Sequence, residues 1–234
     1  MQWKNSILET LEWGNNISNK EKKLKIADKI AAMVDNNSII GVGSGSTAYL
    51  ALQSIAKRIR QEHLNILAIP TSLEISMACA QLNIPQTTLS AHKPDWTFDG
   101  ADEVDPDYNL IKGRGGAMFR EKLLISASQA TYIIADSTKM VTKLGSRFPV
   151  PVEIYPEALS YVEHALKQLP VKEISLRMAQ KKDGPVITEN GNLILDVWFN
   201  EIPGCAESAI KAITVVIEIG LFMHYDVQVI TGEG

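Results

Sequence analysis

The sequence predicts an α/β protein with a Rossmann-like parallel sheet domain, helices on both faces of that sheet, and a smaller α+β domain. Two observations predict this class. Up to residue 148, short apolar segments alternate with stretches whose apolar residues recur at helical spacing. Residues 149–221 then follow a βαββαβ order, which is typical of a ferredoxin-like domain. We therefore expect one domain at 1–148 with 222–234, and a second at 149–221.

The expected elements of the first domain follow one another as strand and helix. Strand-like apolar segments lie at 38–43, 66–70, 96–98 and 131–136, and helical stretches lie at 24–34, 48–59, 73–83 and 117–128. This alternation favours parallel strands joined by right-handed crossovers. Such sheets bind ligands beyond the carboxyl ends of their strands. The loops expected to meet at that edge are 44–47, 71–72, 99–103 and 136–139.

The strands and helices of the smaller domain are expected to follow the βαββαβ order of a ferredoxin-like domain. Its predicted elements are a strand at 151–154, a helix within 156–169, a strand at 172–178, a hairpin within 186–199, a helix at 205–213 and a strand at 214–222. The hairpin is expected because Asn190-Gly191 separates two β-rich runs, and Asn-Gly favours the tight turns of hairpins.

Composition excludes several classes of function. The 234 residues carry a net charge of −4, so no basic face for nucleic acid is expected. No apolar run reaches the roughly 18 residues of a membrane span, and no signal peptide is evident. The two cysteines form no CxxC pair, which favours a reducing compartment. We expect a cytoplasmic protein.

A glycine-rich turn, "GVGSGSTA" at 41–48, joins a predicted strand to a predicted helix. Free backbone N–H groups, a helix start and the hydroxyls of Ser44, Ser46 and Thr47 suit a phosphate. The turn lacks the lysine of a P-loop, and Ser46 stands where a dinucleotide fingerprint has its third glycine. A tight turn capped by Ser or Thr is the alternative without a ligand.

Carboxylates gather in "DGADE", at the end of the third predicted strand. Asp99 and Asp102 lie three residues apart beside the glycine-rich turn. Close carboxylates raise one another's pKa, so one could act as an acid while the other stays ionised. A solvated turn is the plainer interpretation, and it is the one we adopt for Asp105 and Asp107.

The stretch "IKGRGGAMFREK" at 111–122 places cations and glycines before a predicted helix. Its glycines allow close approach to a ligand, and Lys112 could neutralise an oxyanion or a phosphate. Glu121 near the helix start has a structural alternative, because the helix dipole and a neighbouring cation would stabilise it there. The four histidines show no metal-binding spacing, and no metal is expected.

Taken in order, "GVGSGST", "DGADE", "IKGRGGA" with "REK", and "ADSTK" resemble the ribose-5-phosphate isomerase A family. The resemblance runs from about Lys20 to the C-terminus, so residues 1–16 extend beyond the usual start. It implies interconversion of D-ribose 5-phosphate and D-ribulose 5-phosphate in the pentose phosphate pathway. It also implies a cis-enediol intermediate, no metal or cofactor, and a homodimer or homotetramer.

The same resemblance implies roles for individual residues. Glu121 matches the proton acceptor. On physical grounds, Lys112 could be the donor to the enediolate oxygen, and Asp99 and Asp102 are candidates for the proton shuttle that opens the sugar ring. The implied substrate contacts are Ser44, Gly45, Ser46, Thr47, Asp99, Gly100, Ala101, Asp102, Lys112, Gly113, Arg114, Gly115, Lys139 and, from the first long helix, Lys23. A glutamate with a pKa of about 4.3 is a weak base, so a dry site must raise its pKa towards ~6–7.

Two other functions remain open on sequence grounds. A sugar-phosphate sensor would bind without turnover, but it predicts a DNA-binding module, and few residues precede the first strand. A nucleotide-dependent oxidoreductase would need the glycine that Ser46 replaces.

Overall fold

The structure is a computed structural model that describes residues 6–10 and 17–232. Its contacts divide the chain into two compact units. The first comprises Met1–Gly100, Leu123–Ser137 and Val227–Gly234, and the second comprises Ala101–Lys122 and Thr138–Asp226. This division differs from the two domains expected above, whose boundaries stay a prediction. Most of the expected extension 1–16 lies outside the described residues.

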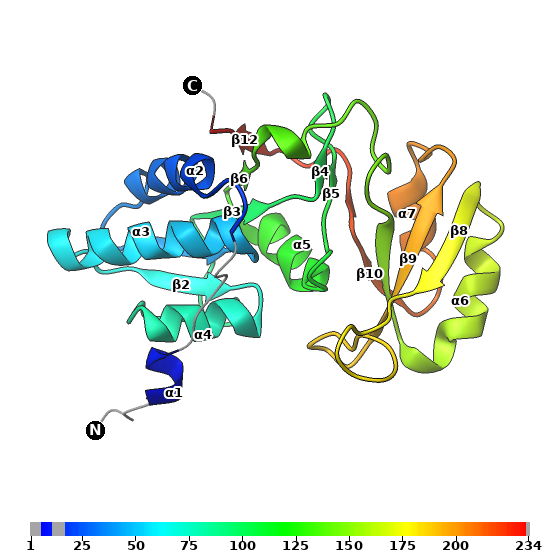
Figure 1. Cartoon of the computed structure of the whole chain (residues 1–234), viewed down its shortest axis with the longest axis horizontal. Helices are drawn as coiled ribbons and strands as arrows, with labels where there is room; N and C mark the ends of the chain where they lie inside the picture. Colours follow the sequence, from blue (N-terminus) through cyan, green and yellow to red (C-terminus); the bar gives the residue numbers. More distant parts are fainter. Residues whose placement is uncertain (1–5, 11–16, 233–234) are drawn as a thin grey trace. The chain divides into compact units, whose positions relative to one another are not determined.

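A five-stranded parallel sheet forms the centre of the first unit, in the order β12-β6-β3-β1-β2 (Figure 1). Its strands are β1 (Ile39–Val42), β2 (Leu67–Pro70), β3 (Trp96–Gly100), β6 (Ala130–Ile134) and β12 (Gln228–Ile230). The four expected strands and their parallel pairing are confirmed. β12 was not expected, because three partly exposed residues give no apolar run.

Helices cover the sheet of the first unit on both faces. They are α2 (Lys20–Ala32), α3 (Ser46–Glu62), α4 (Leu73–Gln81) and the second half of α5 (Met118–Ala127). The short α1 (Ser6–Glu9) contacts α4. In Figure 1, α2 and α3 lie above β2 and α4 lies below it. The core buries apolar faces of α2 and α3, including Ile26, Ile30, Leu52 and Ile55, with Phe98 of β3. Among the described residues, no helix is long and apolar enough to cross a membrane.

The second unit contains the expected ferredoxin-like arrangement. Its elements are β7 (Val150–Ile154), η2 (Pro156–Ala158), α6 (Leu159–Leu166), β8 (Val171–Leu176), β9 (Leu193–Phe199), α7 (Ala206–Lys211) and β10 (Val216–Ile219). The sheet is antiparallel, in the order β10-β7-β9-β8. Val152, Val162, Val197 and Ile210 contribute to its apolar core. The βαββαβ order is confirmed.

The expected hairpin around Asn190-Gly191 is wrong in its first arm. β9 pairs with β8, and the segment just before Asn190 is not a strand. The side chains of Thr188 and Asn192 both donate to Oε1 of the buried Glu153, at 2.7 and 2.9 Å. Because these polar groups turn toward a buried carboxylate, the segment closes a local turn and does not join the ladder.

A small three-stranded sheet, also in the second unit, was not expected from the sequence. It consists of β4 (Glu103–Val104), β5 (Leu110–Ile111) and β11 (Leu221–Phe222), in the order β11-β5-β4. Two-residue strands are too short to show a period. β4 and β5 flank the turn that contains Asp105 and Asp107, so the sheet fixes the backbone on both sides of this turn. Lys112 follows β5 directly.

Candidate active site

The loops that follow β1, β2 and β3 meet in the first unit. The N–H of Ser44 donates to Oδ1 of Asp99 at 3.1 Å. The hydroxyl of Ser44 lies 2.9 Å from that of Thr71 and donates to that of Ser72 at 3.1 Å. Three strand ends therefore bring hydroxyls and a carboxylate together, as expected for the carboxyl edge of a parallel sheet.

Gly43 explains the spacing of the glycine-rich turn. A Cβ atom at this position would lie 2.1 Å from Cγ and from Oδ1 of Asp99, far inside van der Waals contact. Asp99 itself is only 2% exposed, and its Oδ1 also accepts from the N–H of Gly100 at 2.7 Å. Gly43 was not singled out from the sequence, although the G-x-G spacing was its signal. The spacing serves the close approach of a carboxylate.

Lys23 points at the start of α3. Its ammonium donates to Oγ of Ser46, the first residue of that helix, at 3.1 Å. Lys23 is 9% exposed, and Ser46 and Thr47 are half-buried. A helix start adds a positive field and free N–H groups to this cation. The arrangement suits an anionic group such as a phosphate.

A buried ion pair forms in the second unit. Lys112 Nζ lies 3.2 Å from Oε2 of Glu121, and the two residues are 2% and 5% exposed. Lys112 is held by its N–H, which donates to the carbonyl of Gly220 at 2.9 Å. Glu121 lies in the first turn of α5. Charges shielded from water in this way act on each other, and on a bound ligand, more strongly than they would at the surface.

The glycine-rich segment after Lys112 is held by side chains from distant parts of the sequence. Oδ2 of Asp102 accepts from the N–H of Arg114 at 3.1 Å. Arg177 donates to the carbonyls of Gly113 and Arg114 at 2.9 and 3.0 Å, and it forms an ion pair with Asp196. Arg177 and Asp196 were missed from the sequence, where no local pattern distinguishes them from other strand residues.

A hollow of about 380 Å³ lies in the second unit and includes Asp102 and Arg114 in its wall. Its other lining residues are Phe148, Pro149, Pro151, Arg177, Met178, Gln180, Val186 and Asp196. Two of the segments that the sequence assigned to substrate therefore border a cavity of ligand size.

Glu103, the last residue of "DGADE", organises the segment that precedes β7. It is fully buried, and its carboxylate accepts from the N–H groups of Gly145, Arg147 and Phe148 at 2.6, 2.5 and 2.8 Å. The ring of Phe148 then lies 5.4 Å from Nζ of Lys139. The role of Glu103 was not foreseen, because its partners lie some forty residues further along the chain.

The predicted residues divide between the two units. The first unit holds Lys23, Ser44, Gly45, Ser46, Thr47, Asp99 and Gly100, and the second holds Ala101, Asp102, Lys112, Gly113, Arg114, Gly115, Glu121 and Lys139. Within residues 6–10 and 17–232, no group of three or more His, Cys, Asp or Glu side chains is arranged to hold a metal ion.

These features define an α/β protein with a buried carboxylate–ammonium pair and with a lysine at a helix start that suits an anionic ligand. The family model described as ribose 5-phosphate isomerase A (phosphoriboisomerase A) matches residues 67–234. Ribose-5-phosphate isomerase A of Thermosynechococcus vestitus is 44% identical over 92% of both chains. The chain belongs to the ribose 5-phosphate isomerase A family.

Solved structures agree with this assignment. The ribose 5-phosphate isomerase A structure from Methanocaldococcus jannaschii is 40% identical, with a TM-score of 0.88 over 93% of this chain and 97% of that one. A D-ribose-5-phosphate isomerase in complex with phospho-erythronic acid is 34% identical, also with a TM-score of 0.88, over 92% and 96% of the two chains.

Proposed function

We propose that this chain is an aldose–ketose isomerase that interconverts D-ribose 5-phosphate and D-ribulose 5-phosphate. Its relatives carry the name of that enzyme, and one of them binds a phosphorylated sugar acid. The observation that carries the proposal is the buried pair of Lys112 and Glu121, with 3.2 Å between the charged atoms. A base beside a cation, both shielded from water, is what this reaction needs.

Glu121 is the base in this proposal. Its carboxylate removes the proton from C2 of the open-chain aldose, which leaves a cis-enediolate. Glu121 then returns a proton, either the one it removed or one exchanged with solvent, to C1, while a proton moves from O2 to O1, and the ketose results. One carboxylate suffices because the two carbons are neighbours, so the base needs only to hold the proton between the two steps.

Lys112 stabilises the oxygen on which negative charge develops. A positioned donor in a dry site lowers the barrier of such a step by about 3 kcal/mol. The backbone of Lys112 is held because its N–H is bonded to Gly220, and its ammonium group is held by the ion pair with Glu121 before the reaction begins. Little reorganisation is then needed as the charge forms.

The phosphate and the sugar hydroxyls fix the substrate. We assign the phosphate to the start of α3, with Lys23, Ser46 and Thr47. Binding energy from such a remote group can be used to orient the reacting carbons of the substrate. The remaining assigned substrate contacts are Ser44, Gly45, Gly100, Ala101, Gly113, Arg114, Gly115 and Lys139.

Asp99 and Asp102 are assigned to ring opening. Ribose 5-phosphate is mostly a closed ring, and opening it requires a proton to move between the ring oxygen and the anomeric hydroxyl. A carboxyl group can carry that proton. The rates of Asp99→Asn and Asp102→Asn are each to be compared on ring-closed and on freshly opened substrate. A rate lost only on the ring-closed form would indicate ring opening, and a rate lost on both forms would indicate binding.

The test of the function is proton exchange in heavy water. Incubation with ribose 5-phosphate in D₂O should produce ketose, and the aldose recovered at equilibrium should carry deuterium at C2. Absence of both at high enzyme concentration would exclude the isomerase. Saturable binding without exchange would instead indicate a sugar-phosphate sensor.

The assignment of the base is tested by Glu121→Gln. The amide keeps the size of the side chain but cannot accept the proton, so turnover should fall by about 10³-fold or more while sugar-phosphate binding is retained. Glu163→Gln is a matched control in the same unit, because Glu163 forms an i,i+4 bridge with exposed Lys167. Full turnover in Glu121→Gln would remove Glu121 from the role.

We further propose that the enzyme serves the non-oxidative branch of the pentose phosphate pathway in the cytoplasm, as a homodimer or homotetramer. The family assignment supports these finer points. Light scattering coupled to size-exclusion chromatography gives the subunit number directly, and a monomer at micromolar concentration would exclude both assemblies.

A further inference from the structure

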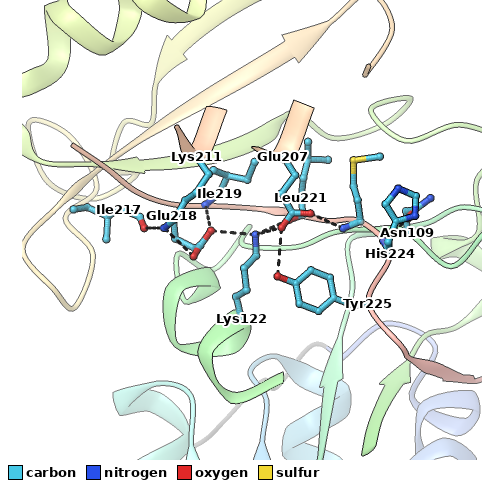
Figure 2. A network of polar contacts seen from close by, with 11 residues as sticks. Asn109, Lys122, Glu207, Lys211, Ile217, Glu218, Ile219, Leu221, His224 and Tyr225 are labelled. Atoms are coloured by element: carbon cyan, nitrogen blue, oxygen red, sulfur yellow. Dashed lines mark hydrogen bonds and ion pairs between the residues drawn. The ribbon is translucent and has the colours of Figure 1, made fainter. Parts of the chain in front are cut away.

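Lys122, the residue after the proposed base, is the centre of a buried polar network (Figure 2). Its ammonium donates to Oε1 of Glu207 and to the carbonyl of Leu221, both at 2.7 Å, and lies 3.1 Å from Oε1 of Glu218. Lys122 is 6% exposed. An ammonium group has three N–H donors, and each here has an acceptor.

This network joins the helix of the base to β11, the strand that pairs with β5 next to Lys112. β11, which begins at Leu221, pairs with β5, and Leu221 lies opposite Ile111. The N–H of Lys112 donates to the carbonyl of Gly220. A Cβ atom on Gly220 would lie 2.1 Å from the carbonyl oxygen of Lys112, so the two backbones are in close contact. The bond from Lys122 to Leu221 therefore fixes α5 against a backbone that also fixes Lys112.

One aromatic ring contacts both cations. The buried ring of Phe222 has its centroid 4.6 Å from Nζ of Lys122 and 5.7 Å from Nζ of Lys112. A ring within reach of two ammonium groups favours both through its π face. The Lys112–Glu121 pair and the Lys122 network are thus parts of one packed unit.

The carboxylates of the network are themselves held in place. Oε2 of Glu207 accepts from the N–H of Met223 at 2.7 Å, and Oε1 of Glu218 accepts from the N–H of Ile219 at 2.9 Å. The half-exposed Lys211 lies 3.1 Å from Oε2 of Glu218. With Lys122, the set contains two cations and two anions.

A buried, charge-balanced set of this kind is a weak means of stabilising a fold, because apolar residues of similar volume are often equally stable. The network instead restricts its side chains, and the backbone that carries them, to one arrangement, because each buried donor and acceptor must meet its partner. In this chain that arrangement is imposed on the first turn of α5, where the base lies.

We propose that Lys122 is a positioning residue for the isomerisation. By holding α5 to β11, it sets the separation of Glu121 Oε2 and Lys112 Nζ, and through it the rate of proton transfer. The proposal rests on the assignment of Glu121 as the base. It concerns the chemical step and leaves phosphate binding unchanged.

The decisive variant is Lys122→Met with Glu218→Gln. This double change removes one cation and one anion, so Glu207 and Lys211 remain balanced. We expect kcat to fall by about 10²-fold, because a displacement of about 1 Å costs that much, while KM stays within about two-fold. Lys167→Met with Glu163→Gln is the matched control, because it makes the same two changes at an exposed i,i+4 ion pair of the same unit, outside the network. Its kcat should equal that of the unmodified chain.

A second variant decides the matter if the double variant does not fold. Glu207→Gln keeps an oxygen that can accept from Met223 N–H but turns an NH₂ group toward Lys122. We expect kcat to fall by about ten-fold or more with KM unchanged. Lys122→Arg retains the charge and the donors, and it should recover most of the activity that the double variant loses.

The outcomes separate this inference from the proposed function. If Glu121→Gln is inactive but both network variants keep kcat within two-fold, Lys122 is merely structural and the inference is overturned. A lowered melting temperature with unchanged kcat has the same meaning. If Glu121→Gln keeps full turnover, the base is misassigned and the proposed mechanism itself is wrong.

Discussion

Replacing Glu103 with Gln should destabilise the second unit without changing its volume. The carboxylate of Glu103 is fully buried and accepts three backbone N–H groups, from Gly145, Arg147 and Phe148. An amide offers one oxygen and one NH₂ group. At least one of the three N–H donors would then face another donor, and the others would lose a charged acceptor.

The magnitude follows from the three bonds. A net hydrogen bond to a charged group contributes about 1.5–3 kcal/mol and one to a neutral group about 0.5–1.5, so each retained bond loses roughly 1 kcal/mol. An unsatisfied buried donor costs about 1–3 kcal/mol more. Because residues 145–148 are only half-buried or exposed, water recovers part of this loss. We expect a decrease of about 3 kcal/mol in the free energy of unfolding.

Urea unfolding measures this decrease. Trp198, in β9 of the same unit, provides a fluorescence signal for it. Glu201→Gln is the control, because Glu201 pairs with Lys143 at the surface, where both side chains are 77% exposed, and such pairs contribute about 0–1 kcal/mol. A decrease below about 1 kcal/mol for Glu103→Gln would show that the three N–H groups do not depend on this carboxylate, and the reasoning would fail.

Three further predictions follow from other contacts. Gly43→Ala should reduce kcat/KM by about 10²-fold or more, because its Cβ would lie 2.1 Å from Asp99; unchanged kinetics would contradict the assigned role of that carboxylate. Arg177→Lys loses the planar guanidinium group that donates to the carbonyls of Gly113 and Arg114, so KM should rise about ten-fold in steady-state assays. An unchanged KM would show that Arg177 does not hold this segment for substrate binding. Burial raises the pKa of the Cys79 thiol from 9.0 to about 12, so the folded chain keeps a proton that the unfolded chain loses, and stability should decline as pH rises through that interval. Mass spectrometry after brief alkylation at pH 8 should accordingly find the exposed Cys205 modified and Cys79 intact, and modification of both would refute this.

The sheet of the first unit could be predicted because its strands carry a strong local signal. β1, β2, β3 and β6 are largely buried, so most of their residues are apolar, and each strand ends at a glycine or is followed by a polar turn. The missed strands are two or three residues long. Their position depends on which backbone lies beside them, and a short window of sequence contains no record of that.

The candidate site was predictable to the extent that its residues lie in compact motifs. From its local sequence, Glu121 could simply be an acidic residue stabilised by the start of a helix. It became a candidate base because four motifs in order resemble the isomerase family. The partners that hold the motifs could not be found in this way. Lys122 meets Glu207 across 85 positions, and such pairs form only when the chain has folded. A charged residue that will be buried looks the same in a sequence as one on the surface.

The pairing of β6 with β12 has a consequence for how the protein is made. The whole of residues 138–226 is synthesised between these two neighbouring strands. On the ribosome, the edge of β6 therefore stays open until residues 228–230 have emerged, and an open edge invites pairing with other chains. Early folding of the intervening segment would bring the two strands within reach of each other, so the order of folding governs how long the nascent chain is exposed to aggregation.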